Sequence, residues 1–188
     1  MRKLLPLALS LAFAIPASDA EAQTMIEGTG EIGYTSANVT DWLGVGAFNG
    51  EPLKYGGSAL ILFGRRGPGG LMLGGEIGYS RLYGYSFVAD GETLSDTVQG
   101  IRFLIVTRFW FNEGAWFGEA SAGLERLTGV DSFESVRDPT LGLAFGTFFD
   151  LSDQLAIVAK ARGTVLFDQG APIPTIGLHT GLSYSLGR

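Results

Sequence analysis

The sequence predicts an all-β fold: an eight-stranded antiparallel up-and-down β-barrel that spans a membrane. After residue 28, about eight segments of alternating hydrophobicity follow one another, joined by short turns and by longer, acidic loops. Only 17% of the residues are charged, yet beyond the N-terminal region no segment approaches the roughly 20 apolar residues of a membrane helix. A membrane chain without helices must close its backbone hydrogen bonds between strands, which favours a barrel.

The N-terminal segment has the layout of an export signal. A basic start is followed by an apolar run at residues 4–15 and by a small-x-small cleavage site, Ala-Glu-Ala, at residues 20–22. The apolar run is too short to span a bilayer, which disfavours a membrane-anchoring helix. We therefore predict a signal peptide over residues 1–22, removed on export, and one barrel domain over residues 23–188.

The predicted strands are long enough to cross a bilayer when tilted. They cover residues 28–35, 55–65, 71–85, 97–111, 116–127, 140–151, 155–167 and 174–187. Short joins rich in turn-forming residues lie at 66–70, 112–114 and 152–154, and longer joins lie at 36–54, 86–96, 128–139 and 168–173. We expect the short joins to face the periplasm and the long ones to face the outside.

Each strand has one large apolar face and one face of small or charged residues. In the segment 97–111, for example, Ile101 and Phe103 alternate with Gly100 and Arg102. Aromatic residues also gather at both ends of the strands, as two interfacial girdles would require. Those beside the short turns are Phe63, Phe109, Trp110, Phe111, Trp116 and Phe148, and those at the opposite ends are Tyr34, Tyr55, Tyr83, Tyr85 and Phe167.

The small face carries balanced charge, which predicts the chemistry of the barrel interior. Its acids are Glu31, Glu76, Glu119 and Glu125, its bases are Arg102, Arg108, Lys160 and Arg162, and the single histidine, His179, shares this face. An unpaired ion in a narrow lumen is strongly destabilising, so we expect a paired network. Because eight-stranded barrels are just wide enough to be filled by side chains, we expect this network to plug the lumen; an ion-selective or small-solute pore is the alternative.

Two short turns fix the register of the neighbouring strands. Counting outward from the turn at 112–114 places Arg108 opposite Glu119 and Arg102 opposite Glu125, which predicts two cross-strand pairs. Counting from the turn at 152–154 places Lys160 opposite Gly146 and Arg162 opposite Ala144, where small partners leave room for long cations.

The signal peptide and these strands resemble the small outer-membrane barrels, the group that includes the transmembrane domain of outer membrane protein A, the opacity proteins and related adhesins. The final segment, 179–186, is similar to the assembly signal of that group, with His179, Gly181, Tyr184 and Leu186 at its characteristic positions. The chain departs from the pattern by ending in Arg188 rather than an aromatic residue. The resemblance implies a bacterial outer-membrane location, insertion by the barrel insertion machinery and a structural or adhesive role.

Two arginines differ from the rest because their register points them toward lipid. Arg81 and Arg126 lie near the outer ends of their strands, so we expect them either to contact lipopolysaccharide phosphates or to serve as simple interfacial anchors. The predicted loops are acidic and offer a possible extracellular binding surface, although solvation alone would also explain their charge. The charged residues of the four longer joins are Asp41, Glu51, Asp90, Glu92, Asp96, Asp131, Glu134, Asp138 and Asp168, with Lys54 and Arg137 as the only bases there.

Several functional classes are disfavoured. The chain has no cysteine and a net charge of −6, which excludes thiol chemistry and argues against nucleic acid as a partner. No ligand spacing for a metal and no cofactor motif appears, and His179 lacks the surrounding motif of a lipid-hydrolysing barrel enzyme, so we expect no cofactor, no enzymatic activity and a monomer. A soluble, exported lipocalin-like ligand-binding barrel is the remaining alternative; in that fold the apolar face would point inward.

Overall fold

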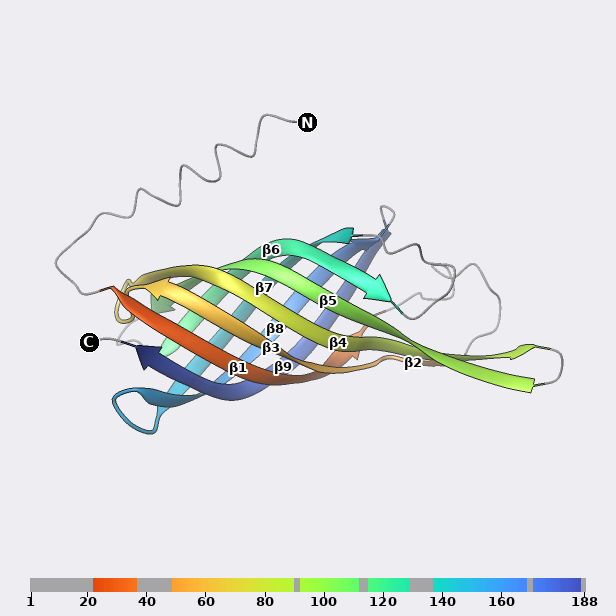
Figure 1. The fold of residues 1–188 in the computed structure, drawn as a ribbon, viewed down its shortest axis with the longest axis horizontal. Helices are drawn as coiled ribbons and strands as arrows, with labels where there is room; N and C mark the ends of the chain where they lie inside the picture. The colour runs from red at the N-terminus through yellow and green to blue at the C-terminus, as the bar shows by residue number, and fades with distance from the viewer. Residues whose placement is uncertain are drawn as a thin grey trace, which may run out of the picture.

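The computed structural model describes residues 22–36, 49–89, 92–111, 115–128, 137–168 and 171–186, and these residues form a closed antiparallel barrel (Figure 1). Its eight staves are β1 (Gln23–Thr35), β3 (Leu53–Gly64), β4 (Leu71–Ala89), β5 (Glu92–Phe111), β6 (Trp116–Thr128), β7 (Arg137–Asp150), β8 (Leu155–Asp168) and β9 (Ala171–Leu186). Each stave pairs with the next, and β1 pairs with β9 to close the sheet. The three-residue β2 (Asn49–Glu51) pairs only with the outer part of β4.

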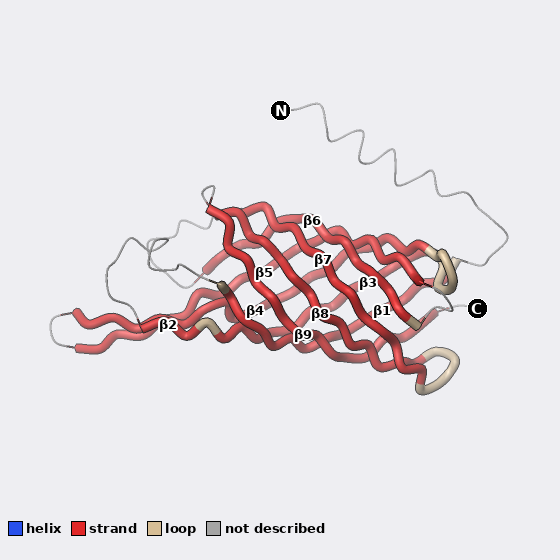
Figure 2. The backbone as a smooth tube through the Cα atoms, turned by 180° about the vertical axis from the view of Figure 1, so that it is seen from behind, coloured by secondary structure: helices blue, strands red, loops and turns tan. Residues whose placement is uncertain are grey.

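All eight predicted staves are present, but two of the predicted long joins are wrong. Residues 86–96 are mainly strand, because β4 and β5 stay paired as far as Ala89 and Glu92. Residues 168–173 are mainly strand as well, since β8 and β9 pair as far as Asp168 and Ala171. The two short turns within the described residues, 65–70 and 151–154, lie at one end of the barrel, and the long β4–β5 ribbon projects from the opposite end (Figure 2). The predicted turn at 112–114 lies outside the described residues.

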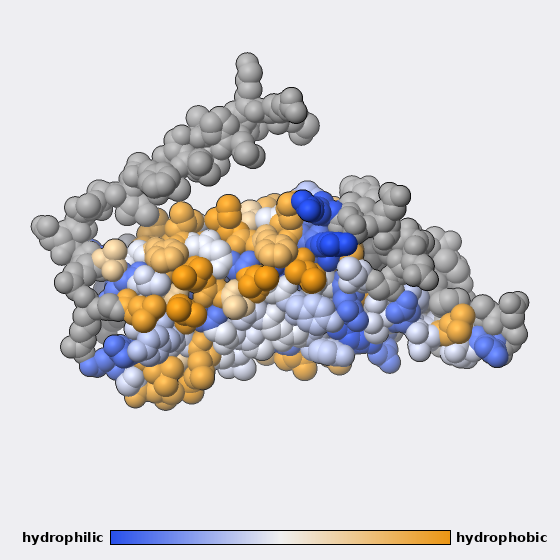
Figure 3. Space-filling model, in the orientation of Figure 1, coloured by the Kyte–Doolittle hydropathy of each residue, from blue (hydrophilic) through white to orange (hydrophobic). Residues whose placement is uncertain are grey.

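The two faces of the sheet are separated as an apolar exterior and a polar interior. Leu143, Ile105 and Leu178 are 71%, 67% and 66% exposed on the outside, and Figure 3 shows an apolar band on the face of the barrel that it views. This is the reverse of a soluble barrel, whose apolar face points inward, so the lipocalin-like alternative is wrong. Within the described residues, no helix is long and apolar enough to cross a membrane.

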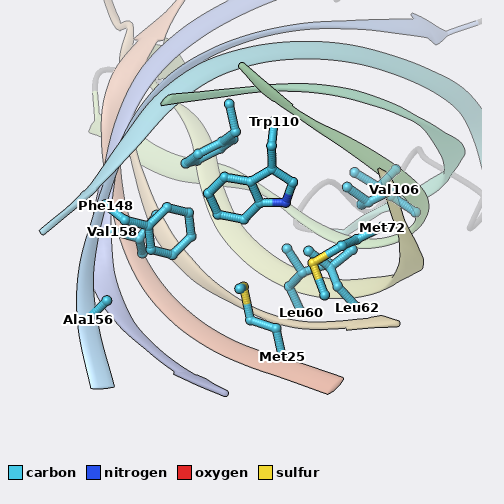
Figure 4. Close-up of a cluster of buried hydrophobic side chains, with 11 residues drawn as sticks. Met25, Leu60, Leu62, Met72, Val106, Trp110, Phe148, Ala156 and Val158 are labelled. Atoms are coloured by element: carbon cyan, nitrogen blue, oxygen red, sulfur yellow. The ribbon is translucent and has the colours of Figure 1, made fainter. Parts of the chain in front are cut away.

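Two apolar clusters occupy the ends of the lumen. The inner cluster, beside the short turns, consists of Met25, Leu60, Leu62, Met72, Leu104, Val106, Trp110, Phe117, Phe148, Ala156 and Val158 (Figure 4). The outer cluster, toward the long β4–β5 ribbon, consists of Leu82, Tyr83, Tyr85, Val98, Leu127 and Leu166. The buried charged residues of the lumen lie between these two clusters.

Four of the aromatic residues that the sequence predicted for the interfacial girdles point into the lumen, so their assignment to the girdles was wrong. Trp110 and Phe148 are 0% and 5% exposed, because strict alternation turns every second residue of an aromatic run into the lumen. Tyr83 and Tyr85 are also buried. A β-bulge between Arg81 and Tyr83 shifts the register by one residue and moves both tyrosines to the inner face.

Glycines on the inner face allow neighbouring strands to approach closely. A Cβ atom on Gly74 would lie 1.7 Å from the carbonyl oxygen of Ile61, whereas one on the adjacent Gly75, which faces outward, would meet nothing nearer than the Leu104 oxygen at 3.9 Å. The backbone of β3 must therefore move to accept any side chain at residue 74.

We predict that Gly74→Ala destabilises the folded barrel by about 1–3 kcal/mol, the range expected for overpacking. Gly75→Ala in the same strand is the matched control and is expected to leave the free energy of unfolding nearly unchanged. Urea unfolding in lipid vesicles measures both. Equal losses for the two variants would show that the close approach of β3 and β4 does not constrain residue 74.

Candidate functional site: the charged barrel interior

The candidate site is the middle of the lumen, where alternation along each strand brings charged side chains from seven staves together. Among the described residues, six acids and five bases are buried here, none of them more than 7% exposed. They are Glu27, Glu31, Lys54, Glu76, Arg102, Arg108, Glu119, Glu125, Asp138, Lys160 and Arg162. His179 of β9 is buried beside them.

The inner part of the network is a ring of two carboxylates and two cations. Arg108 donates to Glu27 at 2.6 Å through Nη2, and to Glu119 at 2.7 Å through Nε. Lys160 lies 2.8 Å from Glu27 and 3.2 Å from Glu119, so each acid contacts both bases. The guanidinium of Arg108 also lies 4.2 Å from the ring centroid of Phe117, which joins this ring to the inner apolar cluster.

The middle of the network is organised by Glu76. Arg162 donates two hydrogen bonds of 2.7 Å to its two carboxylate oxygens, and Arg102 donates a third of 3.0 Å from Nε. Arg162 also lies 3.4 Å from Glu119 and so connects the middle to the inner ring. Bidentate guanidinium–carboxylate contacts of this kind fix both distance and orientation.

Toward the outer end, Glu31 gathers three cationic or ionisable groups. Arg102 donates to both of its oxygens, at 3.0 and 2.8 Å, while Lys54 Nζ lies at 3.7 Å and His179 Nε2 at 3.2 Å. Arg102 thus links Glu31 to Glu76 across the lumen. The network is continuous from Lys54 at one end to the inner ring at the other.

The register predicted from the turn between β5 and β6 is correct, but only one of the two predicted ion pairs forms. Arg108 is opposite Glu119 and bonds to it; Arg102 is opposite Glu125 yet turns to Glu31 and Glu76 instead. Within the part of the chain that the structure describes, Glu125 Oε1 has no hydrogen-bond partner. Register fixes Cα positions, whereas a long guanidinium in a narrow lumen can reach three strands.

The register predicted at the other turn is also correct. Lys160 is opposite Gly146 and Arg162 is opposite Ala144. The small partners leave the space into which both cations extend toward the middle of the lumen.

Three charged residues of the interior were missed or misplaced in the sequence. Glu27 precedes the predicted first strand, which in fact begins at Gln23, and Lys54 and Asp138 were assigned to loops although both are buried within strands. A signal for Glu27 was available, because it is two residues from Thr29 and four from Glu31 and so shares their face. The interior consequently holds more charge than the four acids and four bases expected.

The two arginines predicted to face lipid both lie outside the lumen, but in different environments. Arg81 donates to Glu51 at 2.7 Å and to the backbone oxygen of Leu53 at 3.1 Å, and its guanidinium lies over the ring of Tyr55. Arg126 is exposed on the outer face and lies opposite Arg137.

The predicted assembly segment, 179–186, forms the C-terminal half of β9. His179 points into the lumen, Tyr184 and Leu186 are 41% and 45% exposed on the outside, and a Cβ on Gly181 would lie 1.9 Å from the Gly28 oxygen. Recognition of this segment by the insertion machinery stays a prediction. The predicted signal peptide, apart from Ala22, lies outside the described residues, as do Asp41, Asp90, Asp131 and Glu134 of the acidic loops.

The interior shows no arrangement suited to a metal ion. Among the described residues, no group of three or more histidine or carboxylate side chains could hold one. The oxygens of Glu27, Glu31, Glu76 and Glu119 are instead directed at cations of the chain itself.

Comparison with known proteins supports the fold without assigning a role. No family model matches the chain, and no curated protein matches it. Among solved structures, Neisserial surface protein A is similar with a TM-score of 0.59 and 12% sequence identity, over 87% of this chain and 98% of that one. Ail, the attachment invasion locus protein of Yersinia pestis, is similar with a TM-score of 0.55 and 15% identity, over 88% and 99% respectively. The chain therefore has the fold of these two proteins, a small closed eight-stranded antiparallel β-barrel, and its apolar exterior suits a barrel surrounded by lipid.

Proposed function

We propose that this protein is a non-enzymatic surface protein whose plugged barrel anchors an extracellular binding element, the β4–β5 ribbon. The observation that supports a plugged barrel is the continuous ion-pair network across the lumen. Buried ions are tolerated only when they are paired, and each of the bonded carboxylates here contacts at least two cationic or ionisable groups.

The inner apolar cluster supports a closed lumen rather than a pore. The rings of Trp110, Phe117 and Phe148 pack with centroids 5.0 to 5.6 Å apart across the periplasmic end. These rings fill much of that end of the lumen with apolar side chains, whereas an ion path needs a polar lining.

The environment of His179 supports the absence of catalysis. A lipid hydrolase of the membrane needs its histidine accessible to lipid and beside a nucleophile. His179 is 3% exposed, faces the lumen and contacts Glu31.

The β4–β5 ribbon supports the second half of the proposal. β4 and β5 have 19 and 20 residues, against 12 to 16 for the other staves, and Figure 1 shows them continuing beyond the barrel as a two-stranded ribbon. Its base is fixed, because β2 pairs with β4 and Arg81 bonds to Glu51. A two-stranded ribbon alone is only marginally stable in water, and the contacts at its base hold this one in place. Elements that a rigid scaffold holds outside it in this way are often binding elements, which supports a role in recognition.

The charge on this element favours a cationic partner. Glu92 and Asp96 are exposed on the ribbon. Ail has been crystallised with the heparin analogue sucrose octasulfate. A polyanion of that kind would be repelled by the acidic surface of the present chain.

We predict that the wild-type barrel, reconstituted in planar bilayers, gives no ion conductance, whereas Glu76→Ser combined with Arg162→Ser gives discrete channel events. The double change removes one acid and one base from the middle of the lumen, so the net charge of the lumen is unchanged while the space opens. Glu51→Ser combined with Arg81→Ser removes an ion pair outside the lumen and is the control. Discrete channel events from the wild-type barrel would contradict the plug and support the pore alternative.

We predict that Arg108→Met destabilises the barrel by about 3–5 kcal/mol, because it leaves Glu27 and Glu119 short of a cation. Adding Glu119→Gln should recover part of that loss, with a coupling energy of about 0.5–3 kcal/mol. Urea unfolding of the two single variants and the double variant measures the coupling. Strictly additive losses would contradict a paired network.

We predict that replacing residues 87–94 by Asn-Gly abolishes binding to host cells while the barrel still folds. Ser86 and Ser95 are directly opposite, so a two-residue turn can join them. Bacteria displaying either form are compared in a cell adhesion assay, with heat-modifiable mobility as the folding control. Unchanged adhesion of a correctly folded, trimmed barrel would place the binding surface elsewhere or favour a purely structural role.

A further inference from the structure

Arg126 and Arg137 form an unbalanced pair of like charges on the outer face of the barrel. They are direct partners in the β6–β7 ladder, and both are exposed. Side chains directly opposite in an antiparallel ladder have Cβ atoms about 4.5–5.5 Å apart, and like charges there are destabilising. Within the described residues, neither arginine has a carboxylate within ion-pair distance, in contrast to Arg81 with Glu51.

The pair lies where the apolar band ends. Leu124, two residues before Arg126 on the same face, is 44% exposed, and Ile101, the partner of Arg126 on β5, is 37% exposed. Figure 3 shows strongly hydrophilic side chains bordering the apolar band at the end from which the β4–β5 ribbon extends. This is the depth at which lipid headgroups of the outer leaflet begin.

An apolar groove leads away from the two arginines along the lipid-facing surface. Its volume is about 960 Å³, and Arg126 and Arg137 are the only exposed charged residues that line it. The small residues Ala59, Gly75 and Ala122 form the bottom of the groove. Their partners on the neighbouring strands have large apolar side chains. The large residues along its sides include Ile77, Phe103, Ile105 and Leu124.

We propose that this surface binds a phosphorylated lipid of the outer leaflet, the lipid A part of lipopolysaccharide. The guanidinium groups of Arg126 and Arg137 clamp one phosphate, and one acyl chain lies in the groove. Two guanidinium groups can each form paired, charge-assisted hydrogen bonds to phosphate oxygens, and the anion removes the repulsion between them. The groove accounts for a lipid rather than a free anion, because its lining is almost entirely apolar.

This pair differs from the two arginines singled out in the sequence. Arg81 and Arg126 were each expected to contact a lipid phosphate or to serve as an interfacial anchor, but in the structure Arg81 already forms an ion pair with Glu51. Arg137 takes its place, because β7 begins at that residue and sets it beside Arg126.

The test uses the full folded barrel in a lipid-free, non-ionic detergent, with lipid A, dephosphorylated lipid A and inorganic phosphate as separate probes. Lipid A is expected to raise the thermal unfolding midpoint of the wild type, whereas either other probe at the same concentration should raise it little. In Arg126→Gln with Arg137→Gln, lipid A affinity should fall about tenfold or more, as expected for the loss of charged hydrogen bonds. Arg81→Gln is the matched control and should bind like the wild type.

Two further variants separate the phosphate clamp from the groove. Arg126→Lys with Arg137→Lys keeps the charge and should retain part of the affinity, which distinguishes loss of the site from a general folding defect. Ala122→Phe fills the groove and should weaken lipid A binding without changing the arginines. Equal lipid A binding by the wild type and the double Gln variant, or equal stabilisation by dephosphorylated lipid A or by inorganic phosphate, would overturn the proposal.

Discussion

The burial of charge in a narrow lumen is the constraint on which the rest of the structure depends. A carboxylate removed from water is tolerated only beside cations, and here those cations come from strands far apart in the sequence. Glu27 of β1 is held by Arg108 of β5 and Lys160 of β8, so one acid ties three staves together. Slippage of any of these strands by one residue would expose its charges to lipid, and the network therefore specifies the register of the whole sheet.

The sequence predicts much of this arrangement because lipid imposes a simple rule on each strand. Alternation identified the inward position of Arg108 and Glu119, and a short turn was enough to place them opposite each other. The pairing of Arg102 could not be obtained in the same way, since a long side chain crossing a lumen chooses among carboxylates that are neighbours only in the closed barrel.

Local departures from alternation explain the remaining errors. The bulge at Arg81–Tyr83 adds one residue to β4, so the side chains that follow it on this strand point to the opposite face from the one that alternation predicts. The sequence of that segment contains no residue that would have predicted a bulge. Strand ends were misjudged for a related reason. Beyond the hydrocarbon core of the membrane, both faces of a strand meet water, so the alternation of apolar and polar residues is lost. The backbone hydrogen bonds between the strands nevertheless continue.

The contrast between Arg81 and Arg126 shows how function follows from the partner rather than from residue type. Both are arginines on the outer face near the membrane boundary, yet the first is neutralised by Glu51 and helps to hold the base of the ribbon, while the second faces another cation. A structural charge has its counterion within the chain. Within the described residues Arg126 has none, and two like charges at the end of an apolar groove are stabilised by an anion with an apolar tail, which is the reason that we propose a phosphorylated lipid there.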